Sequence, residues 1–247
     1  MSLPTPDRSP VRALVFDVFG TVVDWRGSII REGEALTAEK GWRVDWPALA
    51  DAWRAGYQPA MQRVMQAKAS GDAAWVKLDE LHRGILHTLL PRFGLDDLSP
   101  PEREHLNLVW HRLDPWPDSV AGLTRLKARY PISTLSNGNV SLLVDMARHG
   151  GLPWDCVLSA ELFRAYKPSP AVYRGAADLL GVAPAELLMV AAHPSDLAAA
   201  AQAGLRTAYV PRPLEYGPGG GLHDAPGDQT FDLVAADFGA LADQLGA

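Results

Sequence analysis

A chain of 247 residues with 47% hydrophobic and 21% charged residues is long enough to bury a large core, either as one large domain or as two smaller ones. Its formal net charge of −6 gives no basic field for nucleic acid or an anionic membrane, and no apolar run reaches membrane-spanning length, so we expect neither partner. The opening MSLPTPDRSP lacks the apolar core of a signal peptide. The single cysteine, Cys156, cannot form an internal disulfide, which suits a cytoplasmic location.

The first predicted element is a strand that ends at Asp17. The residues from Val11 to Phe16 form a near-continuous apolar run, and the turn Val-Phe-Gly-Thr follows Asp17. Such a run is typical of a buried strand in a parallel sheet, and ligands of open α/β sheets bind at the carboxyl ends of those strands. A carboxylate there costs free energy unless something pairs with it. Asp17 is therefore a candidate functional residue, and the alternative is an aspartate that only caps the turn.

Helical periodicity then takes over from Asp24 to about Leu113. It predicts four helices, near residues 27–40, 46–68, 72–92 and 101–113. Their apolar stripes are most simply explained by core packing. A block of helices inserted after the first strand predicts a helical cap domain at residues 26–114.

From Asp118 onward, helices and strands alternate. The helices are expected at 119–130, 140–149, 170–180, 195–203 and 238–245, and the strands at 131–135, 157–158, 187–191, 207–210 and 231–234. This alternation predicts an α/β fold with a doubly wound parallel sheet, formed by residues 1–25 and 115–247. The Pro- and Gly-rich stretch 211–229 is expected to be a loop.

Four polar clusters follow predicted strand ends. They are Asp17, the pair Ser136-Asn137, the run Tyr166-Lys167-Pro168, and residues 193–196. Because the carboxyl ends of parallel strands meet at one edge of the sheet, these clusters should converge there.

The motifs FDVFGT, LSN and YKPSP, followed by a strand and a loop aspartate, resemble the haloacid dehalogenase superfamily over nearly the whole chain. The stretches FDVFGTVVDW, WRAGYQ, TLSNG and AYKPSPAVY resemble its L-2-haloacid dehalogenase branch. The resemblance implies a Rossmann-like haloacid dehalogenase fold with a cap. It also implies hydrolysis of a small 2-haloacid through an aspartyl ester, giving a 2-hydroxy acid and halide. A homodimer is left open.

One position separates this branch from the phosphatases of the same fold. Those enzymes use two aspartates two residues apart, and the second protonates the leaving oxygen. Here Phe19 stands at the second position and cannot donate a proton, whereas a halide leaves as a stable anion and needs none. Only Asp196 is acidic in the loop 191–196, where phosphatases hold Mg²⁺ with carboxylates, so we expect no metal and no cofactor.

The resemblance implies three catalytic residues. Asp17 attacks the halogen-bearing carbon and forms an ester, which splits one displacement into two steps. Lys167 keeps Asp17 ionised, because a nearby cation favours the charged form of a carboxyl group. Asp196 positions or deprotonates the water that hydrolyses the ester.

The resemblance also implies donors for the halide and the substrate carboxylate. Arg54 and Asn137 would face the leaving halide, and the planar fork of Arg54 also suits a carboxylate. The other implied site residues are Ser136 with the backbone N–H groups of Val18 and Phe19 around the substrate carboxylate, Thr21 beside Asp17, and Tyr173 on the following helix. His193 is a further candidate site residue, although the resemblance does not imply it.

The fourth cluster departs from the better-known dehalogenases, which carry a serine and an asparagine there. This chain has Ala191, which has no polar side chain, and His193, which can act as donor, acceptor or cation near neutral pH. Simpler roles remain open: a solvated helix residue for Arg54, core packing for Tyr173, helix capping for Ser136 and Asn137, and a backbone contact for His193. A phosphatase or other small-molecule hydrolase of the same fold, and a protein that only binds small acids, are the alternative functions.

Overall fold

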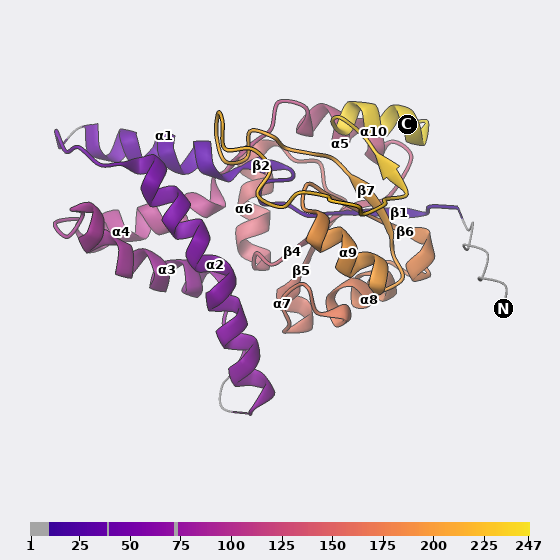
Figure 1. The fold of residues 1–247 in the computed structure, drawn as a ribbon, viewed down its shortest axis with the longest axis horizontal. Helices are drawn as coiled ribbons and strands as arrows, with labels where there is room; N and C mark the ends of the chain where they lie inside the picture. Colours follow the sequence, from indigo (N-terminus) through magenta and orange to yellow (C-terminus); the bar gives the residue numbers. More distant parts are fainter. Residues whose placement is uncertain (1–9, 39, 72–73) are drawn as a thin grey trace.

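The computed structural model describes residues 10–38, 40–71 and 74–247. They contain a six-stranded sheet in the order β5-β4-β1-β6-β7-β8, and every pairing within it is parallel (Figure 1). Its strands are β1 (Ala13–Phe16), β4 (Ile132–Ser136), β5 (Cys156–Ser159), β6 (Leu187–Ala191), β7 (Arg206–Tyr209) and β8 (Leu233–Val234). The predicted parallel α/β sheet is confirmed.

Strand β1 lies in the middle of the sheet, which explains its unbroken apolar sequence. Leu14 pairs with Ile132 on one side and with Leu188 on the other, so both edges of β1 are hydrogen-bonded. All four residues of β1 are buried. Phe16 packs against the rings of Trp154 and Phe238, with centroids 5.4 and 5.5 Å away.

Helices cover both faces of the sheet. Helices α5 and α10 pack together over one face, and α8 and α9 pack together over the other (Figure 1). The helices of this half are α5 (Ser119–Lys127), α6 (Val140–Gly150), α7 (Ala160–Phe163), α8 (Pro170–Leu179), α9 (Pro194–Gln202) and α10 (Phe238–Leu245), with a short 3₁₀ turn, η3 (Pro184–Glu186). The short α7 was not predicted, because four residues carry too little periodicity.

The segment between β1 and the rest of the sheet is helical, and among its described residues no strand joins the main sheet. Its elements are α1 (Trp25–Ala38), α2 (Trp46–Ala69), α3 (Leu78–Leu89), η1 (Leu90–Phe93), α4 (Pro100–Asn107) and η2 (Leu108–His111). They form the left side of Figure 1, beside the sheet.

The predicted third helix begins later than expected, at Leu78. Residues 72–73, like residues 1–9 of the predicted lead-in and core and residue 39 of the predicted first helix, lie outside the described residues. Residues 74–77 are not helical. Trp75 packs on the ring of Tyr166, with centroids 4.2 Å apart, and the Tyr166 hydroxyl donates to the carbonyl of Val76 at 2.8 Å. These contacts with the sheet half outweigh the local helical propensity.

A two-stranded ladder marks the boundary between the two halves and was not predicted. Strand β2 (Val23–Asp24) pairs antiparallel with β3 (Asp114–Pro115), where the chain enters and leaves the helical segment. No helix in the part of the chain that the structure describes is long and apolar enough to cross a membrane.

Candidate active site

The turn after β1 holds Asp17 in a fixed position at the edge of the sheet. Its backbone N–H donates to the carbonyl of Val190 in β6 at 3.0 Å, and Asp17 is 7% exposed. The Thr21 hydroxyl donates to Asp17 Oδ2 at 2.7 Å and accepts from the backbone N–H of Ala192 at 2.9 Å. The buried carboxylate therefore has partners, as its cost of desolvation requires.

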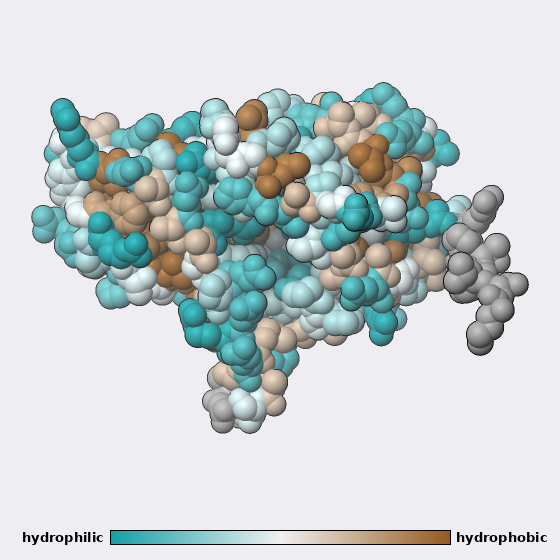
Figure 2. All heavy atoms as spheres, viewed as in Figure 1, coloured by the Kyte–Doolittle hydropathy of each residue, from teal (hydrophilic) through white to brown (hydrophobic). Residues whose placement is uncertain are grey.

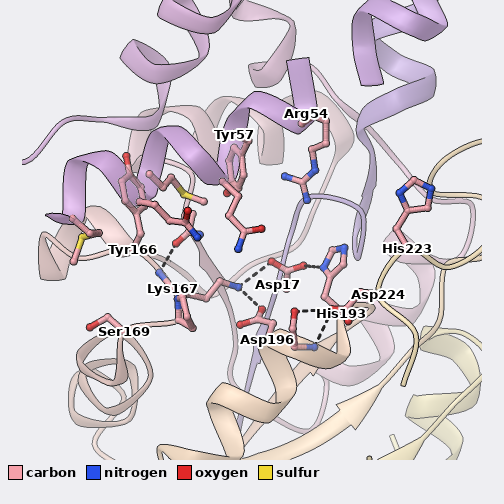
Figure 3. A pocket seen from close by; sticks show the side chains of 18 of the residues that line it. Asp17, Arg54, Tyr57, Tyr166, Lys167, Ser169, His193, Asp196, His223 and Asp224 are labelled. Carbon is pink, nitrogen blue, oxygen red and sulfur yellow. Dashed lines mark hydrogen bonds and ion pairs between the residues drawn. The ribbon is translucent and has the colours of Figure 1, made fainter. Parts of the chain in front are cut away.

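A buried lysine links Asp17 to a second aspartate. Lys167 Nζ lies 3.0 Å from Asp17 Oδ1 and 2.5 Å from Asp196 Oδ2, and the Tyr173 hydroxyl donates to Asp196 Oδ1 at 2.6 Å (Figure 3). Burial alone would lower the pKa of Lys167, but the two carboxylates outweigh it and raise this pKa above its ordinary value. Burial and the charge of Asp17 raise the pKa of Asp196, against the opposing effect of Lys167. Asp196 is thus a stronger base than an exposed aspartate.

A second potential cation, His193, also contacts Asp17. His193 Nδ1 lies 2.9 Å from Asp17 Oδ2, and its Nε2 lies 3.1 Å from Glu215 Oε2. Burial alone would lower the pKa of His193, but the hydrogen bonds to Asp17 and Glu215 raise it to about 10. The imidazole is therefore protonated at neutral pH. Burial would raise the pKa of Asp17, but Lys167 and then His193 hold it well below its usual range.

The Glu215 side chain is held in a fixed position. Its Oε1 accepts from Trp25 Nε1 at 2.9 Å, and only 5% of the residue is exposed. Gly20 lies against it with φ +83°, and a Cβ on Gly20 would stand 2.2 Å from Glu215 Oε1. The glycine of the Asp17 turn is thus required both by its backbone conformation and by the space that Glu215 fills.

Arg54 reaches toward Asp17 from helix α2 (Figure 3). Its guanidinium carbon lies 4.7 Å from the ring centroid of Tyr57 and 5.6 Å from that of Trp25. Its Nη1 is buried without a hydrogen-bond partner among the described residues. A buried cationic donor without an acceptor marks a place for an anion.

Except for Thr21, Trp25 and Glu215, these side chains line one cavity of about 990 Å³ between α2 and the carboxyl edge of the sheet. Figure 2 shows a hollow between the surface formed by α2 and that formed by α9, bordered mostly by hydrophilic residues. Of the predicted site residues, the structure brings together in the lining Asp17, Arg54, Asn137, Lys167, Tyr173, His193 and Asp196. Asn137 also fixes the lysine loop, because its Oδ1 accepts from the Lys167 backbone N–H at 2.7 Å.

Four predicted site residues lie behind this lining. Ser136 is fully buried, and its hydroxyl oxygen accepts from the Gly138 N–H at 3.1 Å. The Phe19 ring packs on Trp110, with centroids 5.6 Å apart. The side chains of Val18 and Thr21 are buried as well. Ser136 thus supports the turn before α6. The backbone of Val18 and Phe19 lies beside Asp17, and their side chains do not.

Sequence reasoning missed Glu215 and the packing role of Trp25 and Tyr57. Glu215 lies in the Pro- and Gly-rich stretch 211–229, where no periodicity or strand end marks a position. Trp25 appeared only at the end of the stretch FDVFGTVVDW, and Tyr57 only within WRAGYQ and as a periodic position of the second predicted helix. Among the described residues, no group of three or more histidine, cysteine, aspartate or glutamate side chains is placed to hold a metal ion.

The comparisons of this chain with known proteins agree with one another. A family model described as haloacid dehalogenase-like hydrolase matches residues 11–204. The (S)-2-haloacid dehalogenase 4A of Burkholderia cepacia is 31% identical over 215 residues, which cover 83% of this chain and 87% of that protein. The crystal structure of the L-2-haloacid dehalogenase PA0810 is 49% identical, with a TM-score of 0.89 and coverage of 96% of this chain and 99% of that one. That of the defluorinating L-2-haloacid dehalogenase Rha0230 is 46% identical, with a TM-score of 0.89 and coverage of 98% and 100%.

Proposed function

This chain belongs to the haloacid dehalogenase-like hydrolases, and within that family we propose that it hydrolyses short 2-haloalkanoic acids to 2-hydroxy acids and halide. The observation that carries the proposal is the setting of Asp17: an ionised carboxylate between two cations, with Phe19 where an acid would be needed to protonate a leaving oxygen. The relatives named (S)-2-haloacid dehalogenase support the (S) stereochemistry.

The first step is an attack by Asp17 on the halogen-bearing carbon. The carboxylate is ionised at neutral pH, because Lys167 and His193 lower its pKa. An oxygen–carbon bond forms as the carbon–halogen bond breaks, and the halide takes the electron pair. We assign the halide and carboxylate contacts to Arg54, whose Nη1 is buried without a partner, and to Asn137.

The second step is hydrolysis of the Asp17 ester by water. Asp196 is the base, since its pKa is raised and it lies next to Lys167 and Tyr173. Among the described residues, neither the Val18 N–H nor the Phe19 N–H donates a hydrogen bond to a backbone acceptor. We propose that they hold the substrate carboxylate.

The proposal divides the chain into two units. Residues 1–25 and 115–247 form the catalytic core, and residues 26–114 form a helical cap that supplies Arg54. The parallel sheet of the core, and the absence of main-sheet strands among the described residues of the insertion, support this division. The free thiol of Cys156 suits the cytoplasmic location that we propose.

Halide release tests the function directly. We expect chloride from chloroacetate and from (S)-2-chloropropionate, and little from the (R) isomer. Fluoroacetate belongs in the same panel, because one similar protein is described as defluorinating. A phosphate ester such as phosphoglycolate is the comparison substrate: its hydrolysis in the absence of halide release would overturn the proposal.

A further inference from the structure

The two carboxylate oxygens of Asp17 have unequal partners. Among the side chains that the structure describes, only Lys167 Nζ hydrogen-bonds to Oδ1, and its charge is shared with Asp196. Oδ2 accepts hydrogen bonds from both the Thr21 hydroxyl, at 2.7 Å, and His193 Nδ1, at 2.9 Å. The Thr21 proton is committed to Oδ2, because the Thr21 oxygen already accepts from the Ala192 N–H. Oδ1 is therefore the freer oxygen for attack on carbon, and Oδ2 becomes the carbonyl oxygen of the ester.

His193 is held from its far side by Glu215. The two carboxylate oxygens of Glu215 lie 3.2 and 3.1 Å from His193 Nε2. Glu215 is fixed by Trp25 Nε1 and by a turn in which its N–H donates to the Arg212 carbonyl at 3.0 Å. Arg212 is anchored in turn by a two-pronged contact with Asp118, at 2.7 and 2.9 Å. Glu215 is thus a preorganised partner and not a loop residue that meets His193 by chance.

We propose that Glu215 is a positioning residue for ester hydrolysis: it keeps His193 doubly protonated, with Nδ1–H aimed at Asp17 Oδ2, so that His193 and Thr21 stabilise the oxyanion of the second step. This inference rests on the proposed function and assigns it one more residue.

Ester hydrolysis proceeds by water addition and then collapse of the intermediate. Water adds to Asp17 Cγ, its proton passes to Asp196, and the electron pair of the carbonyl bond moves to Oδ2. The intermediate then collapses: the Cγ–Oδ1 bond breaks, and the departing oxygen takes the proton from Asp196 to give the 2-hydroxy acid. The new carboxyl group, made of Oδ2 and the water oxygen, releases its remaining proton to solvent.

The contribution is specific to hydrolysis because the charge on Oδ2 changes in opposite directions in the two steps. During attack by Oδ1, negative charge leaves Oδ2 as the carboxylate becomes an ester. During water addition, negative charge develops on Oδ2, and a fixed cationic donor there stabilises the transition state more than the ester. Once Asp17 is ionised, a cation at Oδ2 therefore gives no further help to attack, and it accelerates hydrolysis.

Several charged groups surround His193 and must be considered in any pH profile. They are Asp17 at the end of β1, Glu215 in the 211–229 stretch, Lys167 in the loop before α8, Asp196 on α9 and Arg54 on α2. Of these, Glu215 and Asp17 directly contact the imidazole.

The test is Glu215→Gln, which keeps the shape and a hydrogen-bonding group but removes the charge. In single turnover with chloroacetate, we expect the ester-hydrolysis rate constant to fall roughly tenfold or more, and the alkylation rate constant to change less than about threefold. Mass spectrometry should then find the carboxymethyl ester on Asp17. The matched control is Glu104→Gln on α4, whose carboxylate pairs with Arg83 at the surface, and it should leave both steps unchanged.

A second measurement separates positioning from a general structural effect. In ¹⁵N NMR, the His193 imidazole should titrate near pH 10 in the native protein and at clearly lower pH in Glu215→Gln. In a His193→Asn background, adding Glu215→Gln should change hydrolysis by less than about twofold, because the residue acts only through His193.

Equal slowing of both steps, an unshifted His193 titration, or a full Glu215→Gln effect in the His193→Asn background would each overturn the inference. If the native protein releases no halide from any haloacid, the proposed function fails instead, and the His193 titration still decides whether Glu215 controls its protonation.

Discussion

Arg54→Lys should reduce kcat/KM far more than its conservative character suggests. Arg54 carries a buried Nη1 with no partner among the described residues, and its guanidinium lies against the rings of Tyr57 and Trp25. Lysine keeps the charge but loses the planar fork that can donate to an anion from a fixed position. The substitution thus removes an interaction with the substrate while preserving the electrostatic field.

The size of the effect follows from that one unpartnered donor. A hydrogen bond to a charged group contributes about 1.5–3 kcal/mol, which corresponds to a loss of roughly 10- to 150-fold in kcat/KM. Initial rates of chloride release from chloroacetate measure it. The matched control is Arg63→Lys, an exposed position on the same helix α2, which should stay within about twofold of the native enzyme. An Arg54→Lys enzyme that also stays within about twofold would show that the fork does not contact the reacting anion.

Four other properties of this site can be measured. In ¹⁸O water with enzyme in excess, the first product should be unlabelled and the Asp17 peptide labelled, because water attacks the ester and not the substrate; labelled product would make Asp17 a base instead. EDTA should leave halide release unchanged, since Lys167 and His193 already supply the positive charge at Asp17, whereas loss of activity restored by Mg²⁺ would contradict this. Tyr173→Phe should lower kcat about fivefold, because it removes the donor to Asp196 Oδ1 and with it about 1 kcal/mol; an unchanged kcat would assign Tyr173 to packing. The pKa of His193 rises from 6.5 to about 10 on folding, so its stabilising effect is complete below pH 6.5 and disappears as pH rises through 10; urea unfolding should show the stability difference between native protein and His193→Asn shrinking over that range, and a constant difference would contradict it.

The sequence predicted the fold well because the main strands and helices each have a local pattern of apolar residues. The apolar run before Asp17 has no polar alternation, as a strand bonded on both edges requires, and β1 indeed lies between β4 and β6. The helix from Trp46 was predicted to within one residue at its far end. The start of α3 was not, because Trp75 and Val76 are held by Tyr166, ninety-odd positions away in the chain.

The site could be predicted only as far as strand ends and motifs reach. Asp17, Lys167 and Asp196 follow strands or a recognisable motif, and the structure brings all three into contact. Glu215 could not be found, because its position depends on a turn anchored by Arg212 and not on any regular element. His193 was noticed as a departure, but its role became visible only with that unseen partner.

The pairing of β2 with β3 has a mechanical consequence. The chain crosses between its two halves twice, and the two crossings are bonded to each other by the register Val23 to Pro115 and Asp24 to Asp114. The two crossings therefore form one hydrogen-bonded ribbon between the halves. Because β2 follows the Asp17 turn directly, this ribbon fixes the point at which the helical segment that carries Arg54 leaves the catalytic turn.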